Sequence, residues 1–96
     1  MKIDIKKENG ILSVALEGRL DTVTAPELEG AIVANSDGAS SLTIDCSDLA
    51  YVSSAGLRVL LSAHKKMKGK MKLVNVCEIV MEVLEMTGFA DLWEIV

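Results

Sequence analysis

The start of the chain carries a hairpin pattern, which constrains the fold more than any other feature of the sequence. Ile3 and Ile5 alternate with charged residues, and after Asn9-Gly10 a second alternating segment runs from Leu12 to Glu17. Asn-Gly suits the positive φ angles of a two-residue turn between antiparallel strands. The first two strands are therefore predicted to be hairpin neighbours.

Helix and strand patterns alternate after this hairpin. Thr24-Ala25-Pro26-Glu27 combines a capping hydroxyl, an early proline and a glutamate three residues after the threonine, which predicts a helix start. That helix is expected to end by Gly38. Alternating apolar residues from Ser41 to Cys46 predict a third strand, and we expect a loop from Asp48 to Val52 to follow it.

The second half of the chain repeats the strand and helix patterns. A second helix is predicted after Ser53-Ser54, with a core stripe of Leu57, Leu60 and Leu61, and Gly69 marks its end. A fourth strand over 71–76 and a third helix over 78–87 follow, and a short final strand is predicted over 92–96. The third helix places Ile79, Val83 and Met86 on one side.

This order of elements predicts an α/β fold in a single domain over residues 1–96. Right-handed crossovers through the helices imply a largely parallel sheet, whereas the opening hairpin makes one pair antiparallel. We expect a mixed sheet of four to five strands, and 96 residues provide for a single core.

Charge and hydropathy indicate a cytoplasmic protein with a protein partner. The net charge of −4 argues against nucleic acid and against an anionic membrane, because both are bound by basic surfaces. No apolar run approaches a membrane span, and charged residues interrupt the start of the chain where a signal peptide would be apolar.

No cofactor or metal site is predicted. Cys46 and Cys77 lie far apart without CxxC spacing, and the aspartates show no D-x-D spacing. The segment around Ser54 has one glycine followed by Leu57 and Arg58, which does not support a phosphate-binding loop of the Walker type.

The chain is also not expected to be an enzyme. A serine hydrolase would need a base beside Ser54, and His64 lies ten residues further along the same predicted helix. That spacing corresponds to about 15 Å along a helix, which is beyond hydrogen-bond reach. The G-x-S-x-G elbow of such enzymes is absent.

The serine pair at the start of the second helix remains the strongest functional candidate. The first serine, Ser53, can cap the helix by accepting a hydrogen bond from a free backbone N–H group. The next, Ser54, lies on the first helical turn and can point outward, where the positive end of the helix dipole tolerates added negative charge. A phosphate on Ser54 is therefore expected to leave the fold intact and to change the surface that a partner meets.

Three segments resemble the STAS domain family, and within it the bacterial anti-sigma factor antagonists. Residues 53–57, Ser-Ser-Ala-Gly-Leu, are similar to the switch segment of that family, with Ser54 on its phosphorylated serine. Residues 18–25 resemble its Gly-x-Leu-Asp turn, with Asp21 on the aspartate, and residues 83–89 resemble the end of its third helix. Ser53 stands where those antagonists carry aspartate, and Ala55 replaces a serine or threonine.

The resemblance implies a binding module that is switched by phosphorylation. Such a domain, when unphosphorylated, binds an anti-sigma factor that is also a serine kinase and frees a sigma factor to direct transcription. The kinase inactivates the antagonist, and a serine phosphatase restores it. The alternative is a constitutive structural STAS subunit of a larger signalling or transport assembly. The partner surface is expected to comprise Asp21, Thr22, Ser53, Ser54, Ala55, Gly56 and Arg58.

Overall fold

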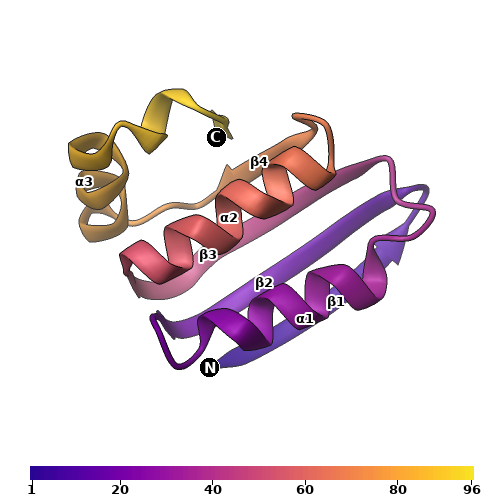
Figure 1. Cartoon of the computed structure of the whole chain (residues 1–96), viewed down its shortest axis with the longest axis horizontal. Coiled ribbons are helices and arrows are strands. Elements are labelled where there is room, and N and C mark those ends of the chain that lie inside the picture. Colours follow the sequence, from indigo (N-terminus) through magenta and orange to yellow (C-terminus); the bar gives the residue numbers. More distant parts are fainter.

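The computed structural model describes all residues, Met1–Val96, as a sheet of five strands in the order β1-β2-β3-β4-β5 (Figure 1). The strands are β1 Lys2–Glu8, β2 Ile11–Leu20, β3 Ser41–Val52, β4 Met71–Val74 and β5 Glu94–Ile95. The helices are α1 Ala25–Asn35, α2 Ser54–Lys66, α3 Glu78–Thr87 and the 3-10 turn η1 Phe89–Asp91. The predicted mixed α/β sheet is confirmed. No helix is long and apolar enough to cross a lipid bilayer.

The opening hairpin forms as its sequence predicts. Asn9 and Gly10 have φ angles of 52° and 80°, and Glu8 pairs with Ile11 directly beyond them. β1 is antiparallel to β2, whereas the pairs β2–β3, β3–β4 and β4–β5 are all parallel. The final strand, predicted over 92–96, spans Glu94–Ile95 beside β4.

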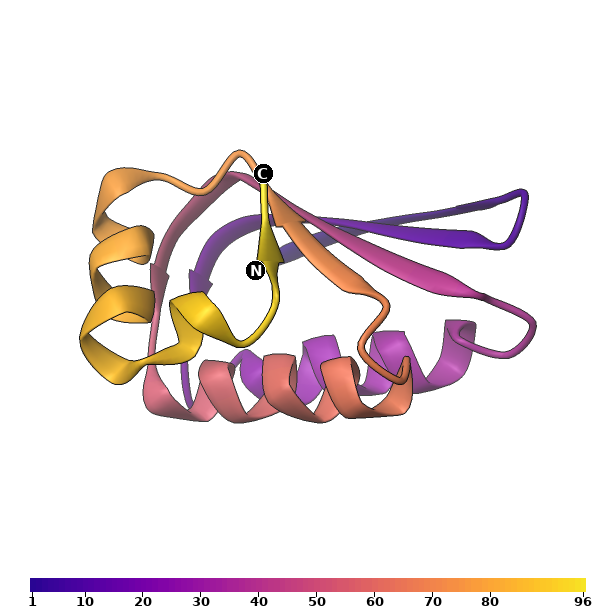
Figure 2. The same cartoon turned by 90° about the horizontal axis from the view of Figure 1, so that it is seen from above.

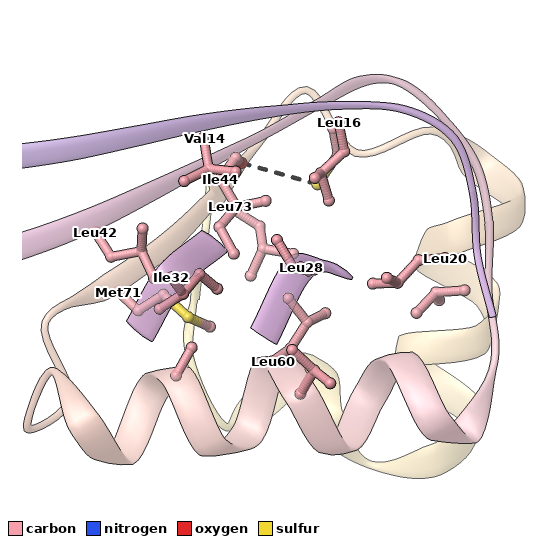
Figure 3. Packing of buried hydrophobic residues seen from close by; sticks show 14 of the residues in the cluster. Val14, Leu16, Leu20, Leu28, Ile32, Leu42, Ile44, Leu60, Met71 and Leu73 are labelled. Atoms are coloured by element: carbon pink, nitrogen blue, oxygen red, sulfur yellow. Dashed lines mark hydrogen bonds between the residues drawn. The ribbon is translucent and has the colours of Figure 1, made fainter. Parts of the chain in front are cut away.

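Helices α1 and α2 form one layer against a single face of the sheet, while α3 lies at one end of it (Figure 2). Between these layers 22 buried side chains form one core (Figure 3). In β2 the even-numbered residues Leu12, Val14 and Leu16 enter this core. Ser13 and Ala15 point to the opposite face, which no helix covers. The alternation of the strands therefore sets the layers of the domain.

β3 is longer than the sequence predicts, because the expected loop from Asp48 to Val52 is part of the strand. Leu49 and Val52 are buried although they are three residues apart, and the register against β2 shifts in this region. The carboxylate of Asp45 accepts hydrogen bonds from the Ser47 N–H at 3.0 Å and from Asn75 Nδ2 at 3.1 Å. Such irregularities break the two-residue period by which a strand is recognised.

The side of α3 formed by Ile79, Val83 and Met86 is not its core face. Val80 and Leu84 are 1% and 0% exposed, whereas Ile79 and Met86 are 59% and 87% exposed. The helix carries two adjacent apolar stripes, and only its packing against β3 selects the one that is buried. Gly88 ends α3 in the left-handed conformation, at φ 80°.

The buried face of α3 predicts a large difference between two substitutions. Leu84→Ala removes a fully buried side chain and is expected to lower the free energy of unfolding by about 2–5 kcal/mol. Met86→Ala is the matched control and is expected to change it by less than about 0.5 kcal/mol. Urea unfolding of both variants measures the difference, and equal effects would contradict the assignment of the buried face.

Candidate partner-binding site at the start of α2

The two serines at the start of α2 have different environments. Ser53 precedes the helix in an extended conformation, and its hydroxyl oxygen accepts a hydrogen bond from the Gly56 N–H at 3.3 Å. Ser53 is therefore the cap that its position predicts. Ser54 is the first helical residue and is exposed. Because the capping position is taken, the Ser54 hydroxyl is left available at the positive end of the helix dipole.

Gly56 allows α2 to approach the end of β2 closely. A Cβ atom at this position would lie 2.7 Å from Leu20 Cγ and 3.0 Å from the Leu20 carbonyl oxygen. The same carbonyl accepts a hydrogen bond from the Ser53 N–H at 2.9 Å. The first turn of α2 is thus held directly against the residue where β2 ends.

The turn that follows β2 is held by the side chains of Asp21 and Thr24. Asp21 Oδ1 accepts hydrogen bonds from the N–H groups of Val23 at 3.0 Å and Thr24 at 3.1 Å. Thr24 Oγ1 accepts from the Asp21 N–H at 2.8 Å and donates to the Arg19 carbonyl at 2.7 Å. The arrangement fixes the turn between β2 and α1.

The capping hydrogen bond that the sequence predicts for the Thr24 hydroxyl is not formed. Thr24 occupies the N-cap position with helical angles, φ −91° and ψ −20°, and its side chain makes no capping bond to α1. Its hydroxyl points back into the turn, where it contacts Arg19 and Asp21. The competing partners within the turn explain why the sequence pattern was misleading at this residue.

Asp21 carries a stable negative charge beside the serine pair. Its pKa lies below the ordinary value because the Thr24 N–H donates to the carboxylate, with further lowering by the Val23 N–H, the Thr24 hydroxyl and the Arg19 charge. The Arg19 guanidinium itself lies over the Tyr51 ring, 4.4 Å from its centroid. Asp21 is therefore ionised at neutral pH.

Parallel pairing of β2 and β3 brings the turn and the serine pair to one end of the molecule (Figures 1 and 2). Leu20 pairs with Val52, so the residues that follow each strand emerge side by side. Three of the predicted site residues are exposed, Thr22, Ser54 and Arg58. Asp21, Ser53 and Ala55 are half-buried, whereas Gly56 is buried and acts on the surface only through the approach it permits.

Sequence reasoning assigned no role to Val23, which lies beside the predicted site residues Asp21 and Thr22. Its side chain is 80% exposed in the turn between Asp21 and Thr24. A large apolar residue so exposed is a frequent contact at protein interfaces, although single exposed apolar residues are also common elsewhere. The only sequence signal was a branched apolar residue inside an otherwise polar turn.

His64 lies in the last turn of α2, at the opposite end of that helix from Ser54. It is half-buried, and its ring meets that of Trp93 edge-on at a centroid distance of 6.0 Å. The helix thus separates the two residues that a hydrolase would need to combine.

Known proteins are similar in sequence to this chain along nearly its whole length. The family model described as the STAS domain matches residues 2–96. The candidate anti-sigma factor antagonist BtrV of Bordetella bronchiseptica is 33% identical over 99 residues, which cover 99% of this chain and 85% of BtrV. The anti-sigma-B factor antagonist of Bacillus subtilis is 29% identical over 98 residues, with 99% and 90% covered.

A solved structure shows the same fold. The anti-sigma factor antagonist from Mycobacterium paratuberculosis superimposes with a TM-score of 0.87 at 27% identity. The superposition covers 98% of this chain and 83% of that protein. The strands and helices that position the candidate site are therefore also present in the Mycobacterium paratuberculosis antagonist.

The contact between Gly56 and Leu20 predicts opposite effects for two glycine substitutions. Gly56→Ala forces a Cβ atom against the Leu20 backbone and is expected to lower the free energy of unfolding by about 1–3 kcal/mol. Gly30→Ala, within α1, meets no atom within 4 Å and is expected to raise it by about 0.5–1 kcal/mol. Thermal and urea unfolding compare both variants with the wild type; a neutral Gly56→Ala would contradict the close contact.

The lowered pKa of Asp21 predicts a stability difference that depends on pH. A carboxylate with a lowered pKa in the folded protein stabilises it above the ordinary value of 3.8, and this contribution is lost as the pH falls through the folded value. The wild type should therefore have a higher free energy of unfolding than Asp21→Asn near neutral pH. This difference in free energy should shrink as the pH falls below 3.8. Urea unfolding of both proteins across this range measures it, and a constant gap would refute the explanation.

Proposed function

The chain belongs to the STAS domain family, and on that premise we propose that it is an anti-sigma factor antagonist, a regulatory binding module rather than an enzyme. In its unphosphorylated form it binds an anti-sigma factor and thereby frees a sigma factor. The observation that carries the proposal is the exposed Ser54 beside the turn of Asp21, on a start of α2 already capped by Ser53. Relatives named anti-sigma factor antagonists support the same role.

The binding surface joins the turn after β2 to the first turn of α2. Thr22, Val23, Ser54 and Arg58 are its exposed members, and Asp21 adds a negative charge at its centre. The position of Ser54 is set by its less exposed neighbours Ser53, Ala55 and Gly56. The surface is rigid at its base because the Leu20 carbonyl and the Gly56 backbone are packed together.

Ser54 is the proposed phosphate acceptor. The first turn of α2 has no acidic residue, so its free N–H groups and the helix dipole favour an added anion. A phosphate would add about 1.5 to 2 negative charges close to the carboxylate of Asp21. The fold is preserved, while the charge of the partner surface changes strongly.

One phosphate is enough to act as a switch. A hundredfold loss of affinity corresponds to about 2.7 kcal/mol, and like charges brought together at an interface cost several kcal/mol. Arg58 lies one helical turn beyond Ser54 and is exposed, so its guanidinium is available to moderate the new charge. The proposed kinase is the anti-sigma factor itself, and a serine phosphatase resets the switch.

Phosphorylation is tested with a candidate anti-sigma factor kinase from the same organism. Incubation with that kinase and ATP should add one phosphate, which mass spectrometry maps to Ser54. Ser54→Ala should abolish the modification. Ser53→Gly is the matched control, because it removes the neighbouring hydroxyl at a capping cost of only a few tenths of a kcal/mol and should leave the phosphate in place. Phosphate on any other residue would contradict the assignment.

Binding of the same anti-sigma factor separates the switch from a constitutive structural role. Ser54→Asp should weaken binding in calorimetry, whereas Ser54→Ala, which adds no charge, should bind like the wild type. If the chain is instead a structural STAS subunit in which Ser53 and Ser54 act only as helix caps, both variants should bind equally. Equal binding would therefore favour the structural alternative.

A further inference from the structure

The first strand has one free edge. β1 ends the sheet order and pairs only with β2, so one row of its backbone groups has no neighbouring strand. In an antiparallel hairpin, opposed residues alternate between pairs that exchange both backbone bonds and pairs that exchange none. Because Glu8 and Ile11 close the two-residue turn as a bonded pair, the even-numbered residues of β1 bond to β2. Ile3, Ile5 and Lys7 therefore direct their N–H and C=O groups outward.

The charges of β1 are complementary to those of a second β1 running in the opposite direction. When two copies pair with Ile5 opposite Ile5, Lys2 meets Glu8 and Asp4 meets Lys6 on the uncovered face of the sheet. All of these charged side chains are exposed. The outward groups of Ile3 then face those of Lys7, and those of Ile5 face each other, so each outward residue finds bonding partners.

The two neighbouring registers that keep this bonding pattern bring like charges together. A shift that centres the pairing on Asp4 places Lys2 against Lys6 and Asp4 against Asp4. A shift that centres it on Lys6 places Asp4 against Glu8 and Lys6 against Lys6. Like charges directly opposite in a sheet are destabilising, so the charge pattern favours the register centred on Ile5 over these two neighbours. A register centred on Ile3 places Lys2 against Asp4 but pairs only residues 1–5, so it forms fewer backbone bonds.

We propose that two copies of this chain associate through antiparallel pairing of β1 with β1, centred on Ile5, to form one continuous sheet. The pairing has two-fold symmetry and closes on itself, because each copy presents the same strand. Charged residues on an edge strand discourage pairing with arbitrary strands, whereas this charge pattern matches its own reverse. A second copy is therefore the occupant that fits the edge.

The side chains on the covered face also suit this association. Ile5 is 37% exposed at the edge of the core, and the pairing would bring the two Ile5 side chains together. α1 lies over the β1 side of the helix layer, in front of β1 and β2 (Figure 1). Its residues Glu29 and Val33 line a groove toward α2. By helical spacing, its opposite flank toward the β1 edge carries Ala31 together with Glu27 and Asn35.

The association leaves the proposed partner site accessible. The pairing is centred on Ile5, which lies opposite Val14 in the middle of β2, whereas the site begins beyond Leu20 at the end of that strand. The proposal does not depend on phosphorylation or on the identity of a partner. Each copy would present its own Ser54.

Charge reversal tests the proposed register. Sedimentation velocity on the full chain, at low ionic strength and up to about 1 mM protein, should show a concentration-dependent dimer. Asp4→Lys places a lysine opposite Lys6 of the second copy, and Lys6→Asp places an aspartate opposite its Asp4, so each variant should lose the dimer. These two variants change the net charge in opposite directions. The double variant exchanges the pair and should recover the dimer.

Two further measurements distinguish this interface from any other. Asp91→Lys, an equal charge reversal at an exposed residue of η1, is the matched control and should dimerise like the wild type. Amide exchange at Ile3, Ile5 and Lys7 should slow as the protein concentration rises. A monomer at every concentration, a dimer that survives both single reversals, or amide protection confined to other elements would overturn the proposal.

Discussion

The contact between the first turn of α2 and the end of β2 is the constraint on which the functional end of the molecule depends. Leu20 meets the α carbon of Gly56 so closely that no side chain fits between them, and its carbonyl also binds the Ser53 N–H. Ser54 therefore lies beside the turn of Asp21 because the backbones touch, rather than through a bond between the two side chains. This close contact limits the conformational freedom of the proposed partner surface.

Charge is distributed unevenly around this contact. Asp21 supplies a carboxylate that holds its own turn, while the first turn of α2 has no acidic residue. An antagonist of the classical type would carry aspartate where Ser53 stands, and here the hydroxyl of Ser53 takes over the capping bond. The negative charge on the surface then comes from the neighbouring turn, and the first turn of α2 has no acidic side chain that would oppose the proposed phosphate.

The two strands of the hairpin have different physical roles. β2 is enclosed between β1 and β3 and provides Leu12, Val14 and Leu16 to the core. β1 has no fully buried residue and alternates isoleucine with charge, so it can tolerate water on its free edge or accept a strand of matching charge. The same alternation that makes β1 a good hairpin partner gives it a self-complementary pattern.

The sequence alone determined the hairpin, the order of the elements, the cap at Ser53 and the family resemblance, because two-residue and helical periods and the preferences of Asn-Gly and serine are local properties. The three-dimensional structure decided the features that depend on contacts between residues of different elements or turns. Irregular pairing with β2 extended β3 beyond Asp48, packing against β3 selected Leu84 over Met86, and the turn drew the Thr24 hydroxyl away from α1. For β3 and α3, long-range packing chose between arrangements that the local sequence left open, whereas the Thr24 hydroxyl was held by neighbours within its own turn.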